Sequence, residues 1–208
     1  MILKADEIAN RLKSRKLVIA PSPCKKLEDL CSSGNASIDL RLGTWFLTLR
    51  HARLSHLELQ IRSKSLVDVQ HEKVTRNQQL TKLQYVRFGD EYFLHPGKFV
   101  LGITLEWLRL PANLAAYVIG KSSLGRKGLI IATATGVHPG YTGCITLELS
   151  NVGEIPVALT PGMQICQIFF HSTNESNTIS TSRYDMKRIP VLGSGKIDPI
   201  VDSLSKAF

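Results

Sequence analysis

Long apolar runs and paired cysteines are both missing from this chain of 208 residues. No apolar segment approaches the roughly 18 residues that a membrane-spanning helix needs, so no membrane partner is expected. The cysteines show no CxxC pair and no spacing typical of metal ligands, and they are Cys24, Cys31, Cys144 and Cys166. Cys144 and Cys166 lie within apolar runs, which indicates reduced core residues. The first seven residues include two acids, unlike a signal peptide, and we expect a cytoplasmic protein.

Common nucleotide-binding motifs are also absent. The sequence contains no Gly-x-Gly-x-x-Gly and no Walker motif, which argues against the usual dinucleotide-binding and P-loop folds. Acidic residues are few, with 17 against 26 lysines and arginines, and the net charge is +9. This balance favours an anionic partner, either a nucleic-acid backbone or a small polyphosphate. A basic surface without a ligand has the same composition, so charge alone does not choose between them.

Short apolar runs separated by turn residues are what the chain does contain, from residue 91 onward. This pattern predicts many short strands in an all-β barrel, jelly-roll or sandwich. Upstream, the alternation in residues 37–43 predicts a half-buried strand that ends at a glycine turn. Residues 4–16 predict a short amphipathic helix with Ile8 and Leu12 on one face. With 43% hydrophobic residues the chain can bury one sizeable core, so we expect a single domain over residues 1–208.

Two segments lack this strand pattern. Residues 50–88 are polar and poor in glycine, with eight lysines or arginines against three acids. We interpret them as a basic insertion between core strands, partly helical or irregular. Residues 171–208 are rich in serine, threonine and glycine, which predicts a mobile C-terminal tail or lid with a hinge at Gly193-Ser194-Gly195.

The segment Gly120–Arg126 offers two hydroxyls, two cations and two glycines within the sequence GKSSLGR. Glycines let the backbone approach a ligand closely, and serine hydroxyls and N–H groups can bind phosphate oxygens. Arg126 can bind them through two N–H groups at once. The segment therefore predicts a phosphate-binding loop, although a polar turn between two strands would have the same composition.

A single carboxylate follows this loop in an apolar strand. Glu148 is the only acid in residues 145–149, on the face opposite Leu147 and Leu149 and on the same face as Thr146. That face either meets solvent or lines a site, and the pattern leaves both open. Together the loop and Glu148 indicate a nucleotide site with one general acid/base.

Five sequence blocks carry a more specific signal. They are SIDLRLG at 37–43, FLHPGKFVL followed by TLE within 93–106, GKSSLGRKGL at 120–129, PGYTGCITLELSN at 139–151 and PGMQICQIF at 161–169. In order and approximate spacing they resemble the dCTP deaminase family, within the trimeric dUTPase superfamily. The resemblance implies a mainly β, distorted β-barrel or jelly-roll subunit of the dUTPase-like type, here with a short N-terminal helix and a polar insertion. It also implies a homotrimer with each active site at a subunit boundary.

The resemblance implies hydrolytic deamination of dCTP to dUTP and ammonia. Glu148 matches the catalytic glutamate, which activates a water for attack on C4 of cytosine. Ser122 and Arg126 match residues that a neighbouring subunit contributes to the reacting centre. The expected substrate-binding residues are Lys121, Ser123, Thr133, Ala134, His138, Tyr141, Gln167 and Tyr184. The family works without zinc, in agreement with the missing H-x-E…P-C-x-x-C signature. Mg²⁺ would accompany the triphosphate as counter-charge.

Two departures from the family pattern leave alternatives open. His138 stands in place of an aspartate, and imidazole lacks the fixed negative charge of a carboxylate. That aspartate positions the hydrolytic water in dUTPase relatives, so a dUTPase or a bifunctional deaminase–diphosphatase is the less favoured enzyme interpretation. Tyr184 and Lys187 match only the beginning of the family's C-terminal lid. A non-catalytic family member that binds a nucleotide is the other interpretation, with nucleic acid as a less favoured ligand.

Overall fold

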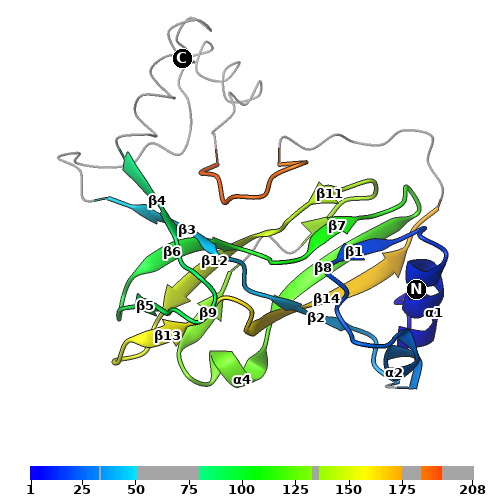
Figure 1. Ribbon diagram of the computed structural model, residues 1–208, viewed down its shortest axis with the longest axis horizontal. Coiled ribbons are helices and arrows are strands. Elements are labelled where there is room, and N and C mark those ends of the chain that lie inside the picture. The colour runs from blue at the N-terminus through cyan, green and yellow to red at the C-terminus, as the bar shows by residue number, and fades with distance from the viewer. Residues whose placement is uncertain (33, 51–79, 133–135, 175–183, 194–208) are drawn as a thin grey trace, which may run out of the picture.

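The computed structural model describes residues 1–32, 34–50, 80–132, 136–174 and 184–193 (Figure 1). The elements up to residue 50 are α1 (Ala5–Lys13), β1 (Val18–Ala20), α2 (Leu27–Ser32), β2 (Ile38–Arg41) and β3 (Trp45–Leu49). They are followed by β4 (Thr81–Tyr85), β5 (Tyr92–Leu94), β6 (Phe99–Ile103), β7 (Trp107–Arg109), β8 (Leu114–Gly120) and α4 (Ser122–Gly125). The remaining strands are β9 (Leu129–Ile131), β10 (Gly136–Val137), β11 (Thr142–Gly143), β12 (Thr146–Asn151), β13 (Val157–Leu159) and β14 (Gln164–Ser172).

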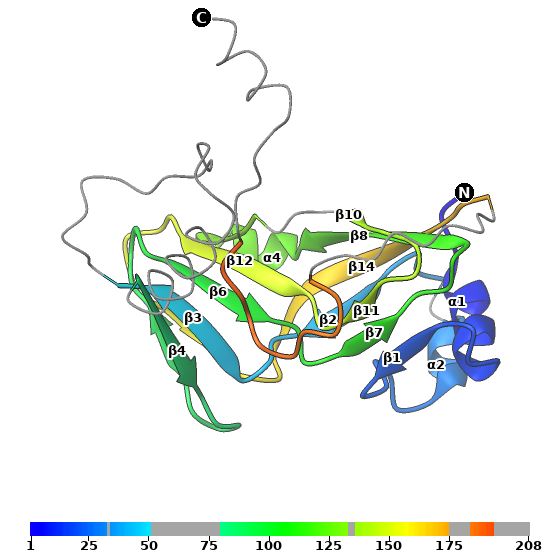
Figure 2. The same ribbon diagram turned by 90° about the horizontal axis from the view of Figure 1, so that it is seen from above.

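The two largest sheets have the strand orders β10-β8-β14-β2 and β4-β3-β6-β12-β9. Two smaller sheets, β1-β7-β11 and β13-β5, complete the strand pairing of the described residues. Seen from above, β3, β6 and β12 lie to the left of β8 and β14 (Figure 2). The strands in the described ranges do not join into one closed barrel. The predicted fold class is nevertheless confirmed, because the structure is mainly β with a jelly-roll-like arrangement of antiparallel sheets.

The core lies between these sheets and is built by alternate residues of their strands. In β8, Leu114, Ala116 and Val118 are buried and the residues between them are not. Its neighbour β14 contributes the buried side chains of Ile168 and Phe170. A strand with every second side chain apolar can turn one face to a core and leave the other face polar. The apolar runs of the sequence predicted these strands correctly.

Helix α1 begins and ends within the predicted range 4–16. Ile8 is fully buried and Leu12 packs against the same core, which confirms the predicted apolar face. The helix ends at Lys13 with Ser14 as its C-cap, and the next residue, Arg15, has a positive φ of 56° that does not continue a right-handed helix. No helix in the described part of the chain combines the length and the apolar character needed to cross a bilayer.

The two cysteines predicted in the core are buried and carry free thiols. Burial raises the pKa of the Cys144 thiol to about 11 and that of the Cys166 thiol to about 12. Because the thiolate is the reactive form, both side chains behave as small apolar core residues.

Strand β4 lies within the predicted insertion 50–88, which was expected to be partly helical or irregular. Residues 81–85 pair with the whole of β3 and are flanked by the buried side chains of Leu80 and Val86. The expectation of helical or irregular structure was therefore wrong for this part. The strand lies at a sheet edge with mostly exposed or half-buried side chains, so its sequence carries no apolar run. Residues 51–79 lie outside the described ranges.

A buried ion pair joins β2 to the turn before β7. Glu106 is fully buried, and its carboxylate accepts hydrogen bonds from the backbone N and the Nη1 of Arg41, each at 2.8 Å. Arg41 Nη2 also donates to the carbonyl oxygen of Pro23 at 3.2 Å. Burial raises the pKa of the Glu106 carboxyl, and the hydrogen bonds and charge of Arg41 offset part of that rise. The charge of Glu106 is thus stabilised by one partner side chain.

Arg41→Ala should lower the free energy of unfolding by about 3–5 kcal/mol, because it leaves a buried carboxylate without its cation. Urea denaturation at one fixed protein concentration measures this loss. The same substitution in a Glu106→Gln background should cost clearly less, since no buried charge is then left uncompensated. Equal losses in the two backgrounds would show that Arg41 contributes by packing alone.

Candidate active site

Strand β12 places Glu148 between β6 and β9 in the five-stranded sheet. Leu147 and Leu149 point into the core, and Glu148 is half-buried on the opposite face, as the alternation predicted. Across the sheet Glu148 is level with Leu101 of β6, so an apolar side chain neighbours the carboxylate. Its own carbonyl oxygen accepts a hydrogen bond from the backbone N of Ala132 at 2.9 Å. The strand therefore holds Glu148 at a fixed position on the outer face of the sheet.

The predicted phosphate loop forms the single-turn helix α4. The backbone N of Leu124 and of Gly125 donate to the carbonyl oxygen of Lys121, at 3.0 and 3.1 Å. Three of the predicted site residues on this turn are exposed, namely Ser122, Ser123 and Arg126. Gly128 closes the turn with a φ of 88°, and a Cβ there would lie 2.9 Å from the backbone N of Gly153. The loop thus presents hydroxyls and a guanidinium outward from a tightly closed turn.

Lys121 and Gln167 meet at a third side chain. Lys121 Nζ donates to Asp39 Oδ2 at 2.7 Å, and Gln167 Nε2 donates to Asp39 Oδ1 at 3.1 Å. Lys121 Nζ also donates to Gln164 Oε1 at 3.1 Å. These residues come from β2, β14 and the end of β8, which are neighbours in one sheet. The structure therefore joins two of the predicted phosphate contacts through one carboxylate.

Asp39 had no predicted role, although its strand was recognised. The only available signal was its place between Ile38 and Leu40, both of which are buried. That alternation indicates an acid on an outer face but does not name its partners. Gln164, the exposed first residue of β14, had no predicted role either.

Tyr141 is packed against the core beside the described C-terminal segment 184–193. Its hydroxyl donates to the carbonyl oxygen of Cys144 at 2.7 Å, and burial raises the pKa of the phenol. Within this segment the backbone N of Met186 donates to Thr142 at 2.6 Å, and Lys187 accepts from the backbone N of Cys144 at 3.0 Å. These bonds hold the segment along β11, at the entry to β12.

Arg188 and Tyr184 belong to the same segment. The Arg188 guanidinium lies 4.8 Å from the ring centroid of Trp107 in β7, within range of a cation–π contact. Tyr184 is exposed. Within the predicted tail 171–208, β14 extends to Ser172, and residues 175–183 and 194–208 lie outside the described ranges.

His138 is exposed, and its carbonyl oxygen accepts a hydrogen bond from the backbone N of Tyr141 at 3.2 Å. It follows β10 and begins the turn that leads to β11. The predicted contacts Thr133 and Ala134 lie outside the described residues.

The predicted site residues separate into two groups along the chain. One group surrounds α4 and includes Lys121 and Arg126; the other follows β11 and β12 and includes Tyr141 and Glu148. Because β9 pairs with β12 from Asn151 to Leu149, α4 leads into β9 at the Asn151 end. That end is about 10 Å along the strand from Glu148. Figure 1 shows α4 at the lower edge of the molecule and the segment 184–193 at the upper edge.

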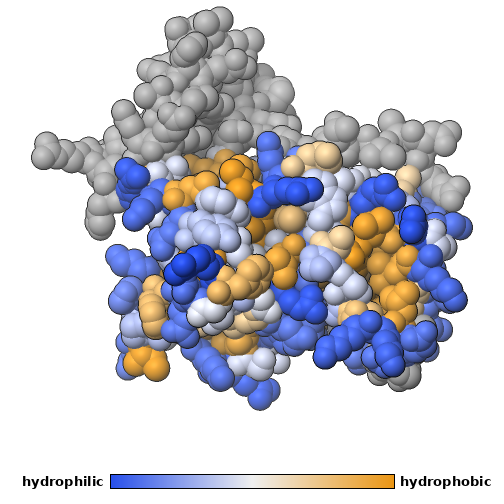
Figure 3. All heavy atoms as spheres, in the orientation of Figure 1, coloured by the Kyte–Doolittle hydropathy of each residue, from blue (hydrophilic) through white to orange (hydrophobic). Residues whose placement is uncertain are grey.

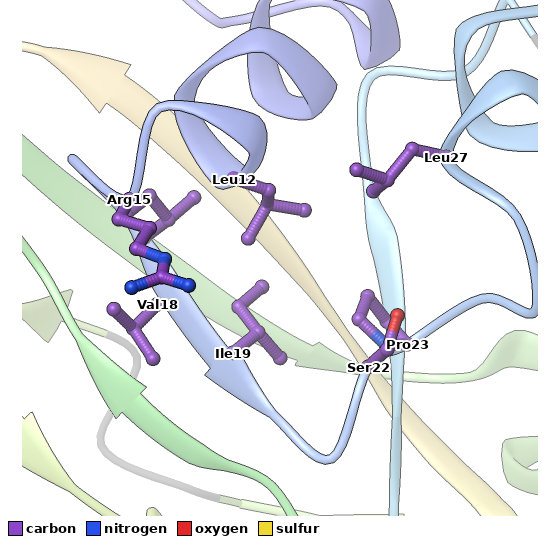
Figure 4. Close-up of a pocket in the computed structure, with 8 residues that line it drawn as sticks. Leu12, Arg15, Val18, Ile19, Ser22, Pro23 and Leu27 are labelled. Carbon is purple, nitrogen blue, oxygen red and sulfur yellow. The ribbon is translucent and has the colours of Figure 1, made fainter.

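An apolar groove opens elsewhere on the surface. Its volume is about 290 Å³, and it lies between α1, β1 and the residues that lead into α2. Leu12, Ile19 and Leu27 surround it, with Arg15 at one side (Figure 4). The space-filling view shows apolar atoms gathered in the same region, to the right over β1 (Figure 3). Its lining includes none of the predicted site residues that the structure describes, so the groove is separate from the candidate active site.

Comparison with known proteins gives matches along most of the chain. A family model described as dCTP deaminase-like matches residues 2–173. A "dCTP deaminase, dUMP-forming" of Dictyoglomus turgidum is 39% identical over 206 residues, which cover 95% of this chain and 96% of that protein. A "dCTP deaminase" of Natronomonas pharaonis is 43% identical over 171 residues, which cover 82% of this chain and 80% of that protein.

A solved structure supports the fold. The crystal structure of 2'-deoxycytidine 5'-triphosphate deaminase from Agrobacterium tumefaciens has a TM-score of 0.55 and 22% sequence identity. The match covers 81% of this chain and 47% of that one, so this chain spans about half the length of the solved chain. The family match extends over the strands and the loop that hold Glu148, Lys121 and Gln167, and this chain belongs to the dCTP deaminase-like family.

Proposed function

We propose that this chain catalyses the hydrolytic deamination of dCTP to dUTP and ammonia, a step of pyrimidine deoxynucleotide metabolism. The observation that carries the proposal is Glu148, the one acidic residue of β12, half-buried beside Leu101 in a dCTP deaminase-like chain. Relatives at 39% and 43% identity are named dCTP deaminases. A carboxylate at a fixed strand position with an apolar neighbour is suited to repeated proton transfer.

Glu148 acts first as general base and then as general acid. Its carboxylate takes a proton from a water, and the water oxygen attacks C4 of cytosine. The proton then passes to the 4-amino nitrogen, the C4–N bond breaks and ammonia leaves. As the C4 carbonyl forms, its oxygen loses the second proton of the water, and that proton ends on ring nitrogen N3, which gives the N3–H of uracil. One water is consumed for each dCTP, and the chemistry at C4 is assigned to Glu148 without zinc.

The loop around α4 and strand β14 supply the groups that bind the triphosphate. Lys121, Ser123 and Gln167 bind phosphate oxygens, and Arg126 can donate two hydrogen bonds to one phosphate. Tyr141 supports the proposal because its hydroxyl donates a hydrogen bond to the carbonyl oxygen of Cys144, which holds the aromatic ring in place for the deoxyribose. The proposed substrate contacts also include Thr133, Ala134, His138 and Tyr184.

Mg²⁺ enters this site with the substrate. The described part of the chain has no group of three or more His, Cys, Asp or Glu side chains arranged to hold a metal ion. Mg²⁺ commonly keeps several waters and binds through substrate phosphates. A cation held by the triphosphate, as its counter-charge, therefore fits the residues present better than a protein-held ion does.

The active form is a homotrimer in which Ser122 and Arg126 serve the Glu148 of a neighbouring subunit. The separation of α4 and Glu148 along β9 and β12 supports this arrangement. Exposed hydroxyl and guanidinium groups at the edge of one subunit are available to a second one. A cyclic assembly gives every site the same pair of contributions.

Glu148→Gln keeps the size of the side chain and removes the base. Deamination should fall by about 10²–10⁴-fold while dCTP binding persists. Ammonia release measures turnover, and calorimetry measures binding. Glu154→Gln is the matched control, because Glu154 is exposed in the turn after β12, and it should keep wild-type turnover. Near-normal turnover of Glu148→Gln would remove Glu148 from the proposed role.

Arg126→Ala and Glu148→Gln subunits should each be inactive alone and regain activity when they are mixed. In a cyclic assembly formed at random from equal amounts, about one quarter of the boundaries carry both intact groups. The recovered rate of ammonia release should approach that fraction of the wild-type rate. If mass-tagged subunits are seen to exchange and no activity returns, each site is built from one chain.

The product should be dUTP, and dUTP supplied as substrate should remain intact. His138 stands where the family has an aspartate, which in dUTPase relatives positions the hydrolytic water, so that carboxylate is missing. His138→Asp alone should not create strong dUTP hydrolysis, because position 138 is exposed and a catalytic carboxylate must be held within hydrogen-bond reach of its water. Pyrophosphate release measures dUTP hydrolysis by the wild-type protein and by His138→Asp. Formation of dUMP from dCTP, as the name of the relative from Dictyoglomus turgidum describes, or rapid conversion of dUTP to dUMP by the wild-type protein would contradict this.

A further inference from the structure

Asp39 is the meeting point of three strands on the outer face of the β10-β8-β14-β2 sheet. In the strand register Asp39 is directly opposite Gln167, which is opposite Ile119 two residues before Lys121. Side chains opposite one another on neighbouring strands lie on the same face. Both carboxylate oxygens are used: Oδ2 accepts from Lys121 and Oδ1 accepts from Gln167. The carboxylate and the ammonium are partly shielded, with side-chain exposures of 28% and 20%.

The neighbouring cation, Arg41, binds groups other than Asp39. It follows Asp39 by two residues on β2, but its guanidinium is bonded to Glu106 and to the carbonyl oxygen of Pro23. Lys121 is therefore the cation that pairs with Asp39 within the described ranges. The 2.7 Å ion pair restricts the orientations of both side chains more than hydration in water would.

We infer that Asp39 is a positioning residue that orients Lys121 and Gln167 toward the phosphates of the nucleotide. This inference rests on the proposed function and assigns a role to a residue of the same site. Lys121 has three N–H donors, two of which point to Asp39 and Gln164. The third is left for a phosphate oxygen. One N–H of the Gln167 amide is held by Asp39, which sets the direction of the other.

Charge repulsion alone predicts a change in the KM for dCTP that is opposite to the change expected from positioning. A negative charge near a triphosphate repels it, so an aspartate that did nothing else would weaken binding. Its removal would then lower the KM for dCTP. If Asp39 instead holds the two donors in place, its removal raises KM, because the donors must be ordered when the nucleotide binds.

The test compares wild type, Asp39→Ala, Asp39→Asn and the control Asp90→Ala in steady-state deamination of dCTP. Asp90 is an exposed aspartate paired with Arg87 at 2.9 Å in the turn between β4 and β5, and its removal should change neither constant. Asp39→Ala should raise KM about tenfold and leave kcat within about twofold, the size expected from losing a charge-assisted hydrogen bond. Asp39→Asn keeps one acceptor oxygen for Lys121 and should recover part of the affinity.

A double-substitution cycle separates positioning from a structural role. In a Lys121→Ala background Asp39→Ala should have less than about a third of its effect on KM, because the main side chain that it orients is gone. A merely structural aspartate would act equally in both backgrounds. An unchanged or lower KM in Asp39→Ala, or an undiminished effect in the Lys121→Ala background, would overturn the inference.

Calorimetry with dCTP and Mg²⁺ measures binding without turnover, so it tests positioning by Asp39 separately from the proposed function. A wild-type protein that binds dCTP without deaminating it would refute the proposed function, yet weaker dCTP binding by Asp39→Ala would still support positioning. Equal binding by both, with normal wild-type turnover, would refute positioning alone. If Asp39→Ala does not fold, Asp39→Asn preserves the shape of the junction, and its affinity decides the question.

Discussion

The alternation of side chains along β12 is the constraint on which the site depends. Leu147 and Leu149 are fully buried in the core, and that burial fixes the register of the strand between β6 and β9. A slip of one residue would turn both leucines outward and drive Glu148 into the core. Burying an unpaired carboxylate costs on the order of several kcal/mol of folding free energy, so such a slip is strongly disfavoured. The hydrophobic core therefore holds the backbone of Glu148 in a register that places its carboxylate on the outer face of the sheet.

The second large sheet follows the same rule, with polar groups at its outer face. Ile38 and Leu40 are buried while Asp39 between them reaches Lys121 and Gln167. The fully buried Glu106 has its own cation, so the two carboxylates do not compete for one partner. One sheet thus holds the proposed acid/base and the other holds proposed phosphate contacts. Glu148 and α4 lie at different positions along β12 and β9, and this separation supports the proposal that more than one subunit contributes to the site.

Local features of the site could be predicted from the sequence, and its long-range contacts could not. The face of Glu148, the buried thiols of Cys144 and Cys166 and helix α1 followed from periodicity, because burial imposes a repeat on neighbouring residues. The contacts of Asp39 join residues 82 and 128 positions apart, which no local pattern encodes. Strand β4 was missed because an edge strand with few buried side chains lacks that repeat. The five sequence blocks supplied the family, which periodicity alone does not.

The most direct test is to incubate the wild-type protein with Mg²⁺ and each deoxy- and ribonucleoside triphosphate in turn, and to separate the products by chromatography. We predict that dCTP is converted to a uracil nucleotide with one ammonia released per molecule and that the adenine and guanine nucleotides are unchanged. Tight binding of dCTP without any product would contradict the proposed activity. Salt-sensitive binding of long nucleic acid without turnover would instead identify a nucleic-acid-binding protein on the same fold.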